Sequence, residues 1–329
     1  MLAVKIAGLG AYLPERIVTS AELEAELGLA PGWVARATGV LERRRATDET
    51  AAGMAAIAGR RALASAGMDP GELDLIIAAS SAPQQAIPCT AALVQRELGA
   101  PDGMSACFDV NATCLSFLAA LQSAAHLVAA GSYRAALVVS SEIVGRSLNP
   151  QEPESAVLFG DAAAAAVVVR TPEGEPSRVV WEQFATFSSG ADLTTIRGGG
   201  TLHHPNDPAT TPELNMFQMS GTAIYKQAAR RAGPFLERFL ARASWEREQI
   251  DWVVPHQASG HAVAILNERF GFRAEQVVSN LAVRGNCVAA SIPLALTEAV
   301  TVGRITRGQR VLLIGTGAGL TIGAVGLIF

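Results

Sequence analysis

Short apolar runs alternate with longer amphipathic segments along the whole chain. Apolar runs of about four to eight residues between turn residues are typical of buried strands, and apolar positions that recur every three or four residues indicate helices. The pattern predicts strands over Val4–Leu9, Leu73–Ala79, Ala135–Ser140, Ala156–Phe159, Ala163–Arg170, Trp252–Pro255, Gln276–Ser279, Val311–Gly315 and Ile322–Phe329. It predicts helices over Thr50–Ala66, Ala91–Leu98, Cys114–Ala130, Ala223–Arg242, Ser259–Phe270 and Val288–Val302. This alternation favours an α/β protein built on parallel sheets.

The order of elements occurs twice along the chain. Residues 107–140 contain a strand, a turn with Cys114, a helix and a second strand. Residues 276–315 repeat this order around a turn with Asn286, and a strand pair ends each repeat. A duplicated sequence predicts two similar sheets whose halves meet at a shared cleft.

The segment 171–176 consists of threonine, proline, glutamate and glycine and is typical of a linker. We therefore expect one half over residues 1–171, with the Cys114 turn, and a second half over residues 172–329. Residues 188–215 contain three consecutive glycines and several prolines. We expect them to form a long loop over the mouth of the cleft.

Composition and charge narrow the range of functions. Half of the 329 residues are hydrophobic, and the formal net charge is −4. The chain has no basic block, which argues against nucleic acid as a partner, and no apolar run reaches the ~20 residues of a membrane span. Its N-terminus begins as a strand, without the basic start of a signal peptide. The cysteines lack zinc-site spacing, and reduced thiols favour a cytoplasmic enzyme. They are Cys89, Cys107, Cys114 and Cys287.

The segment Asn111-Ala112-Thr113-Cys114 lies where small polar residues give way to an apolar helix. One face of that helix carries Leu115, Leu118, Leu121, Ala125 and Val128. Asn111 or Thr113 could cap the helix. Cys114 would then lie in the first turn, where exposed N–H groups and the helix dipole stabilise a thiolate. This segment alone leaves two interpretations open, an activated nucleophile and a buried structural thiol.

Two distant segments favour the nucleophile. The apolar run Asp251–Val254 predicts a buried strand that delivers His256 into the turn beyond its end. Loops at the carboxyl ends of strands are where α/β sheets place their chemistry. Gly285-Asn286 precedes another helix of small residues. Alone, His256 would be an ordinary hydrogen-bonding residue and Asn286 a turn residue, but with Cys114 they form a candidate catalytic set.

These segments resemble the thiolase superfamily, specifically ketoacyl-acyl-carrier-protein synthase III and its relatives. The resemblance extends from about Val4 to Phe329. Each matching piece is weak alone, but all five in family order are very specific. They are Asn111-Ala112-Thr113-Cys114, Phe159-Gly160-Asp161-Ala162-Ala163, Pro255-His256-Gln257-Ala258, Gly285-Asn286 with Ala289-Ala290-Ser291-Ile292-Pro293, and Gly315-Thr316-Gly317-Ala318-Gly319-Leu320-Thr321-Ile322-Gly323.

The resemblance implies the five-layered αβαβα thiolase fold and a decarboxylating Claisen condensation. Cys114 would accept an acyl group from a thioester, because a thiolate is a good nucleophile and leaves well. His256 and Asn286 would donate hydrogen bonds to the enolate formed when a malonyl thioester loses carbon dioxide. The resemblance assigns the backbone N–H groups of Cys114 and Ala318 to the oxyanion of the acyl thioester.

The same resemblance implies the substrates and partners. The acyl donor would be an acyl-coenzyme A or an acyl group on acyl carrier protein (ACP), and the extender malonyl-ACP or malonyl-coenzyme A, with no tightly bound cofactor and no metal. A homodimer is implied, as is docking of ACP through Lys226 and Arg230, for which a solvated helix face is the ordinary alternative. The runner-up function is acyl transfer through Cys114 without condensation.

Three other classes fit less well. Papain-like proteases also use a Cys–His–Asn set, but the sequence around Cys114 lacks their Cys-Gly-Ser-Cys-Trp pattern. Thiolases proper carry a second cysteine in the last glycine-rich turn, where this chain has Thr316-Gly317-Ala318-Gly319. That turn could also be a tight hairpin between two core strands. A non-enzymatic scaffold is disfavoured because all three polar residues are present.

Several positions depart from the acetyl-primed members of the family. Trp33 matches the tryptophan that contacts the coenzyme A adenine, but Ala37 and the acidic stretch 152–156 stand where the adenine-facing arginines are expected. His261 occupies the place of a carrier-docking arginine. Ile87 replaces the phenylalanine that reaches across the dimer to the floor of the acyl pocket. We therefore expect a medium or longer acyl chain.

Overall fold

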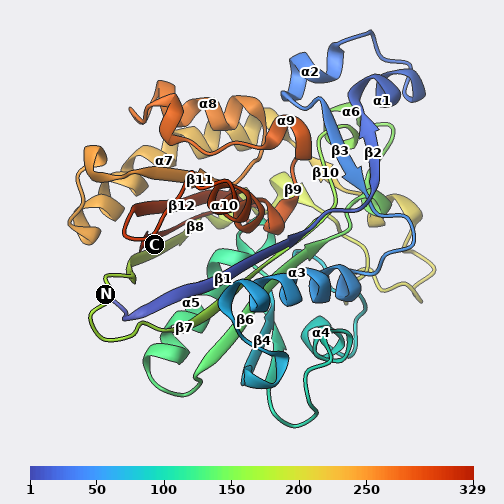
Figure 1. The fold of residues 1–329 in the computed structure, drawn as a ribbon. Helices are drawn as coiled ribbons and strands as arrows, with labels where there is room; N and C mark the ends of the chain where they lie inside the picture. The colour runs from blue at the N-terminus through green and yellow to red at the C-terminus, as the bar shows by residue number, and fades with distance from the viewer.

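The computed structural model describes every residue from Met1 to Phe329 and contains two main β-sheets. Figure 1 shows one sheet lying over the other. The first has the order β1-β7-β6-β4-β5, with β1 over Val4–Tyr12, β4 over Leu75–Ala78, β5 over Ala106–Asp109, β6 over Ala135–Glu142 and β7 over Ala162–Arg170. The second has the order β11-β12-β13-β8, with β8 over Arg178–Thr186, β11 over Trp252–Pro255, β12 over Arg310–Gly317 and β13 over Thr321–Ile328.

Helices form three layers around these sheets (Figure 1). α3 (Ala51–Ala66) and α4 (Thr90–Leu98) pack on the outer face of the first sheet. α7 (Gly221–Ala243) and α8 (Gly260–Glu268) pack on the outer face of the second sheet. The largest core cluster lies between the sheets, around α5 (Ser116–Ala129) and α10 (Ser291–Thr301). The predicted five-layered αβαβα fold is confirmed.

The duplication is also present in the pairing of the strands. β4 pairs with β6 in parallel, as β11 pairs with β12. The next two pairs are antiparallel in both sheets, β6–β7–β1 in the first and β12–β13–β8 in the second. The chain crosses from one sheet to the other between Arg170 and Arg178. The boundary between residues 171 and 172 remains our proposal for the division of the two halves.

Two predicted strands are wrong. Ala156–Phe159 begins at the end of a short helix, α6 (Pro153–Ala156), and Phe159 forms only one isolated bridge, to Asn286. Gln276–Ser279 overlaps a 3-10 turn, and only Val277 bridges to β11. The side chain of Gln276 closes that turn, since it accepts from Arg273 N and donates to the Ile250 carbonyl. The second sheet therefore has no full counterpart of β5.

The apolar face predicted for the Cys114 helix is confirmed, because all five of its residues are buried. The structure adds short elements that the pattern did not indicate. They are β2 (Arg16–Thr19), α1 (Ser20–Glu26), α2 (Trp33–Thr38), β3 (Glu42–Arg45), β9 (Thr194–Thr195), β10 (Gln218–Met219) and α9 (Leu281–Arg284). Arg43 joins the β2–β3 hairpin to the first half, since its buried guanidinium donates to the carbonyls of Val18 and Val157. No helix is both long enough and apolar enough to span a bilayer.

Candidate active site

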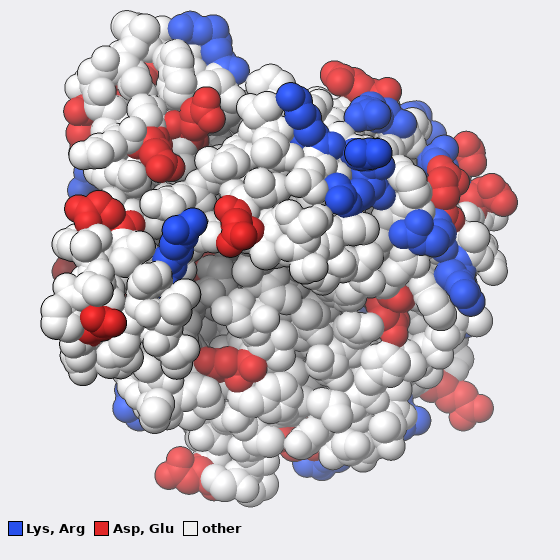
Figure 2. Space-filling model, turned by 180° about the vertical axis from the view of Figure 1, so that it is seen from behind, with Lys and Arg blue, Asp and Glu red and all other residues white.

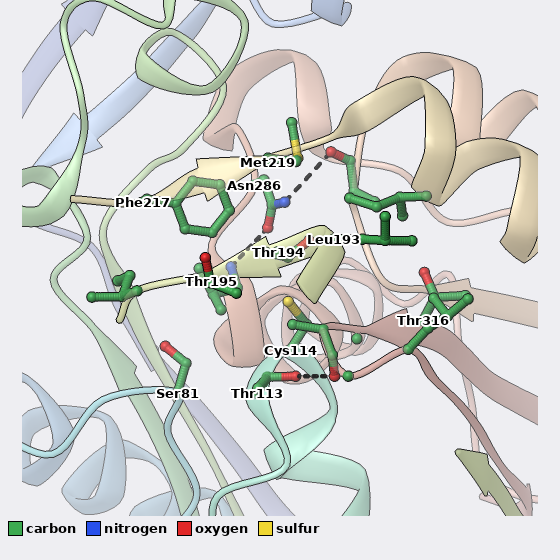
Figure 3. Close-up of a pocket in the computed structure, with 18 of the residues that line it drawn as sticks. Ser81, Thr113, Cys114, Leu193, Thr194, Thr195, Phe217, Met219, Asn286 and Thr316 are labelled. Carbon is green, nitrogen blue, oxygen red and sulfur yellow. Dashed lines mark hydrogen bonds between the residues drawn. The ribbon is translucent and has the colours of Figure 1, made fainter. Parts of the chain in front are cut away.

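A cavity of about 540 Å³ lies between the two halves, beyond the carboxyl ends of β4 and β11. Its lining is mostly hydrophobic and includes Cys114, His256 and Asn286. Figure 3 shows the sulfur of Cys114 directed toward the Asn286 side chain across the cavity. The loop over residues 188–215 covers the mouth as expected, because Gly190, the segment 193–197 and Leu202 all line the cavity.

The turn that carries Cys114 is a single 3-10 turn, Thr113–Leu115, which leads into α5. The Asn111 side chain accepts a hydrogen bond from Thr113 N at 2.9 Å, and Thr113 has a φ of 53°. A left-handed φ is uncommon outside glycine and asparagine, and it holds the chain in a sharp bend. Neither Asn111 nor Thr113 caps α5, whose own N-terminus has no side-chain cap. The predicted cap is therefore wrong, and Asn111 stabilises the bend instead.

Asn286 lies in the same kind of turn in the second half. Its side-chain oxygen accepts a hydrogen bond from Val288 N at 2.8 Å, and Val288 has a φ of 49°. Its amide group donates to the Ala258 carbonyl at 3.4 Å, a long contact that leaves the NH₂ close to the cavity. The two asparagines are thus related by the internal duplication. Asn111 supports the turn of the candidate nucleophile, and Asn286 is itself part of the cavity wall.

The backbone of Asn286 is fixed from the first half of the chain. Its N–H donates to the Leu158 carbonyl and its carbonyl accepts from Gly160 N, both at 3.0 Å. Gly160 must be glycine, because a Cβ there would lie 2.1 Å from the Arg284 carbonyl oxygen. The Phe159-Gly160 segment, which resembles a family motif, therefore positions a polar residue of the opposite half.

His256 follows β11 directly and belongs to the floor of the cavity. Its backbone N–H donates to the Ile314 carbonyl at 2.8 Å, and the residue is only 6% exposed. Burial lowers the pKa of His256 to about 4, so the imidazole is neutral at physiological pH. Its Nδ1 has no hydrogen-bond partner within the protein. A neutral imidazole of low basicity suits hydrogen-bond donation better than proton abstraction.

Cys114 is a thiol in the free protein. Burial raises the pKa of Cys114, and the neighbouring Glu142 carboxyl raises it further. The backbone N–H groups of Ala318 and Cys114 act in the opposite direction, because both donate toward the sulfur. The thiolate predicted from the helix dipole is therefore wrong for the free protein, since burial outweighs the local donors. The same two N–H groups are those that the resemblance assigns to the oxyanion.

The raised pKa of Cys114 has a direct consequence for alkylation. We expect the rate of its reaction with iodoacetamide to keep rising above the pKa of ~8.5 of an ordinary cysteine. Intact-mass kinetics between about pH 7 and about pH 10 would measure this, with free cysteine as the reference compound. Labelling of the Cys114→Ala protein corrects for the half-buried Cys89 and Cys107. If the rate stopped rising at or below the pH at which the rate of free cysteine levels off, the argument that burial raises the pKa of Cys114 would be contradicted.

Glu142 was not identified from the sequence. It is buried at the end of β6 and accepts hydrogen bonds from Ser81 N and Ser81 Oγ, both at 2.7 Å. A further bond comes from the backbone of Ala289. Burial raises the pKa of Glu142 to about 7. The available signal was a carboxylate at the end of an otherwise apolar buried strand, where an ionisable residue is rarely tolerated without a role.

The turn Ala318-Gly319-Leu320 joins β12 to β13 and brings Ala318 beside Cys114. The Thr113 hydroxyl donates to the Ala318 carbonyl at 3.3 Å, a contact between the two halves (Figure 3). Gly317 allows this approach, because a Cβ there would lie 2.8 Å from the Thr113 hydroxyl. The segment is a hairpin between core strands and also part of the cavity wall, and its role as an oxyanion donor remains a prediction.

The remaining predicted site residues lie outside this cavity. Ile87 is 84% exposed and does not line the cavity of its own chain. Trp33 is half-buried on α2. Lys226 and Arg230 are exposed on α7, and Figure 2 shows basic side chains gathered on the face of the molecule that carries this helix. The roles assigned to these four residues remain predictions.

The other histidines have ordinary surroundings. His126 forms a 2.6 Å contact with Glu182 near the surface. His203 and His204 lie in the loop over the cavity, where His204 Nδ1 accepts a hydrogen bond from Asn206 N. No group of three or more histidine, cysteine or acidic side chains is arranged to hold a metal ion.

Comparison with known protein families gives two matches in this chain. Residues 108–187 match the family described as 3-oxoacyl-[acyl-carrier-protein (ACP)] synthase III. Residues 240–328 match the family described as the C-terminal part of the same enzyme. The first match contains the Cys114 turn, and the second contains both His256 and Asn286.

Individual relatives agree over nearly the whole chain. A protein of Streptomyces coelicolor named beta-ketoacyl-[acyl-carrier-protein] synthase III 3 is 38% identical over 98% of this chain and 96% of its own length. The crystal structure of the synthase III of Aquifex aeolicus superposes with a TM-score of 0.89 at 35% identity, covering 99% and 100% of the two chains. The priming beta-ketosynthase of the R1128 polyketide biosynthetic pathway gives a TM-score of 0.90 at 30% identity, covering 98% and 95%.

Proposed function

Because the chain belongs to the 3-oxoacyl-[acyl-carrier-protein] synthase III family, we propose that it transfers an acyl group to Cys114 and condenses it with a malonyl thioester. The product is a 3-oxoacyl thioester. The main support is the geometry of one cavity, in which a thiol, a neutral imidazole and an amide NH₂ border the same space. Each of these groups has a separate role in the two half-reactions.

In the first half-reaction the Cys114 sulfur attacks the carbonyl carbon of an acyl thioester. The bond from that carbon to the donor sulfur breaks, and the thiol proton passes to the departing sulfur, so no external base is consumed. The N–H groups of Ala318 and Cys114 point toward the sulfur. We place the carbonyl oxygen there, because donors aimed at a developing oxyanion stabilise the transition state.

In the second half-reaction the malonyl thioester loses carbon dioxide, and its α-carbon becomes the nucleophile. Negative charge develops on the oxygen of its thioester carbonyl. His256 and the Asn286 amide donate hydrogen bonds to that oxygen, and the neutral state of His256 supplies an N–H without a competing positive charge. The α-carbon attacks the acyl carbonyl on Cys114, and the sulfur leaves and takes up a proton.

The second candidate is acyl transfer through Cys114 without condensation. It needs a base to activate the acceptor, and a buried imidazole with a pKa of about 4 is a poor base. Simple acyl transfer also gives no role to the side-chain amide of Asn286, a residue whose backbone forms two hydrogen bonds with the other half. Condensation accounts for both groups, so we favour it.

A two-step assay tests this function. Intact-mass analysis after incubation with acyl thioesters of increasing length should show a single acyl adduct and identify the preferred donor. Addition of malonyl-ACP or malonyl-coenzyme A should then discharge the adduct as a 3-oxoacyl thioester. An adduct that discharges only to other acceptors, with no carbon dioxide released, would support the transferase instead.

The substrates that we propose follow from the family and from the positions at which this chain differs from other members of the family. We propose acyl-coenzyme A or acyl-ACP as donor, no tightly bound cofactor, and a homodimer located in the cytoplasm. Docking of ACP would use Lys226 and Arg230, which are exposed on α7, and Trp33 would contact the adenine of coenzyme A. The match to a priming ketosynthase supports a specialised pathway as an alternative to primary fatty-acid synthesis.

Ile87 provides a test of acyl chain length. In the proposed dimer its exposed side chain would close the acyl pocket of the partner subunit. Ile87→Phe adds bulk there, so we expect a shift toward short acyl donors. Each methylene excluded from the pocket costs ~0.8 kcal/mol, or about fourfold in specificity. The measurement is kcat/KM for a series of acyl donors.

The initial rate of Cys114 alkylation serves as the control in this series and should not change in the Ile87→Phe protein. Identical chain-length profiles in the wild type and the variant would show that Ile87 does not line the pocket. The proposed preference for longer chains would then have no support.

A further inference from the structure

A second cavity, of about 210 Å³, adjoins the first behind His256. It lies between α7 and α8 and is closed from below by β12 and β13 of the second sheet. The two cavities have a common wall made of Leu158, Met219, Ile224, His256, Ala258 and Thr316. Cys114 and Asn286 line only the first cavity. The second cavity thus lies on the His256 side of the reaction centre.

Small residues keep this space open. Ala228, Ala229 and Ala232 lie on the face of α7 that is turned toward Ala262 of α8. Protein interiors are normally packed as densely as organic crystals, and larger apolar residues at these positions would fill the gap. The surrounding buried side chains are Ile265, Leu266, Ile314 and Ile322. The cavity therefore has a buried apolar floor, and its rim on α7 is more exposed at Tyr225.

The lining selects the chemistry of the occupant. No acidic or basic side chain other than the neutral His256 borders the cavity. The polar groups, Tyr225, Ser259 and Thr316, are few among many aliphatic ones. Such a lining favours a hydrocarbon chain, because burial of apolar surface is the main favourable contribution available there.

The position of the second cavity indicates which substrate carries the hydrocarbon chain. The acyl chain on Cys114 would occupy the first cavity, because Cys114 lines that cavity and not the second. In the proposed function the second thioester places its enolate oxygen at His256, beside the common wall. A substituent on the α-carbon of that thioester would point toward the common wall, where the small side chain of Thr316 leaves more room than a bulky residue would.

We propose that the second cavity binds an alkyl group on the α-carbon of the extender, so that the enzyme accepts 2-alkylmalonyl thioesters. This proposal rests on the proposed function. The 2-alkylmalonyl thioester loses carbon dioxide, its α-carbon forms the new bond to the acyl carbonyl, and the Cys114 sulfur leaves and is protonated. The product is a 2-alkyl-3-oxoacyl thioester with one hydrogen left on the α-carbon.

The kinetic test blocks the cavity without touching the reaction centre. The Ala229→Leu substitution should lower kcat/KM for 2-hexylmalonyl thioester by about tenfold or more, the effect of excluding two methylenes. Its kcat/KM for malonyl thioester should stay within about twofold of the wild type. Ala262→Leu blocks the opposite wall in case the first variant does not fold, and Ala241→Leu, exposed on α7, is the matched control.

A binding test does not depend on condensation. In the Cys114→Ala protein, a 2-hexyl-3-oxoacyl-pantetheine should bind at least about tenfold more tightly than its unsubstituted counterpart, measured by calorimetry. Addition of Ala229→Leu should bring the two Kd values together. Equal Kd values in the unblocked protein, or a ratio that survives blocking, would overturn the proposal. Failure of the proposed function would appear separately, as the absence of a Cys114 adduct or of condensation with malonyl thioester.

Discussion

Replacing Cys114 by alanine should abolish both the acyl adduct and the 3-oxoacyl product. Cys114 carries the only thiol that lines the cavity, and the N–H groups that would hold the oxyanion converge on its sulfur. Without it the acyl thioester can bind but has no atom to receive the acyl group. Removal of a covalent nucleophile typically costs many orders of magnitude in kcat. Intact-mass analysis and product quantification measure the two losses independently.

Cys287 provides the matched control. It is buried beside the Asn286 turn, and burial raises the pKa of its thiol far above the usual range. We expect Cys287→Ala to keep the acyl adduct, since that thiol packs among small residues such as Ala162 and Ala290. An adduct that persists in Cys114→Ala and disappears in Cys287→Ala would show that the nucleophile is Cys287, in the second half of the chain.

The long elements and the central residues could be predicted because their signals are local. The Cys114 helix, for example, has an uninterrupted apolar face, and β12 and β13 are continuous apolar runs. The duplication then implied that the Cys114 turn and the Asn286 turn face one another. Their common hydrogen bonds, from Asn111 to Thr113 and from Asn286 to Val288, show that this inference had a physical basis.

The strands that the pattern missed, β8 among them, could not be predicted because distant partners determine them. β8 is an edge strand with mostly half-buried residues, so its apolar pattern is weak. The β2–β3 hairpin depends on Arg43, whose partners include a carbonyl 114 positions away. Gln276 bonds within its own turn and also to Ile250, which explains why an apparent strand became a turn.

The prediction of the protonation state of Cys114 was wrong for a similar reason. The helix-dipole argument considers only the residues around the turn, where donors do favour the thiolate. The opposing contributions are burial among residues of both halves and the carboxyl of Glu142, which comes from β6. Neither can be read from the segment near Cys114, so the local sequence indicated a candidate nucleophile but not its pKa.

Replacing His256 by alanine or Asn286 by aspartate should separate the two half-reactions. Both variants should still take up an acyl group on Cys114. A histidine with a pKa of about 4 is a poor proton acceptor, so its loss should cost acylation little. Decarboxylation of the malonyl thioester should fall by ~10²–10³ in the His256 variant, the usual effect of losing one donor to a developing oxyanion. Aspartate at position 286 keeps an oxygen that accepts from Val288 N but replaces the NH₂ by a carboxylate oxygen. Its negative charge repels the enolate in addition to the loss of the donor, so this variant should lose at least as much.

Single-turnover measurements distinguish this division of roles from its alternative. The acyl adduct is formed first and isolated, and release of carbon dioxide from labelled malonyl thioester is then followed for each variant. His126→Ala is the matched histidine control, because His126 contacts Glu182 near the surface and lies outside the cavity. Variants that decarboxylated normally but could not be acylated would show that His256 activates the thiol and Asn286 orients it. That result would replace the condensation mechanism with a protease-like arrangement, in which a basic histidine rather than a hydrogen-bond donor is required.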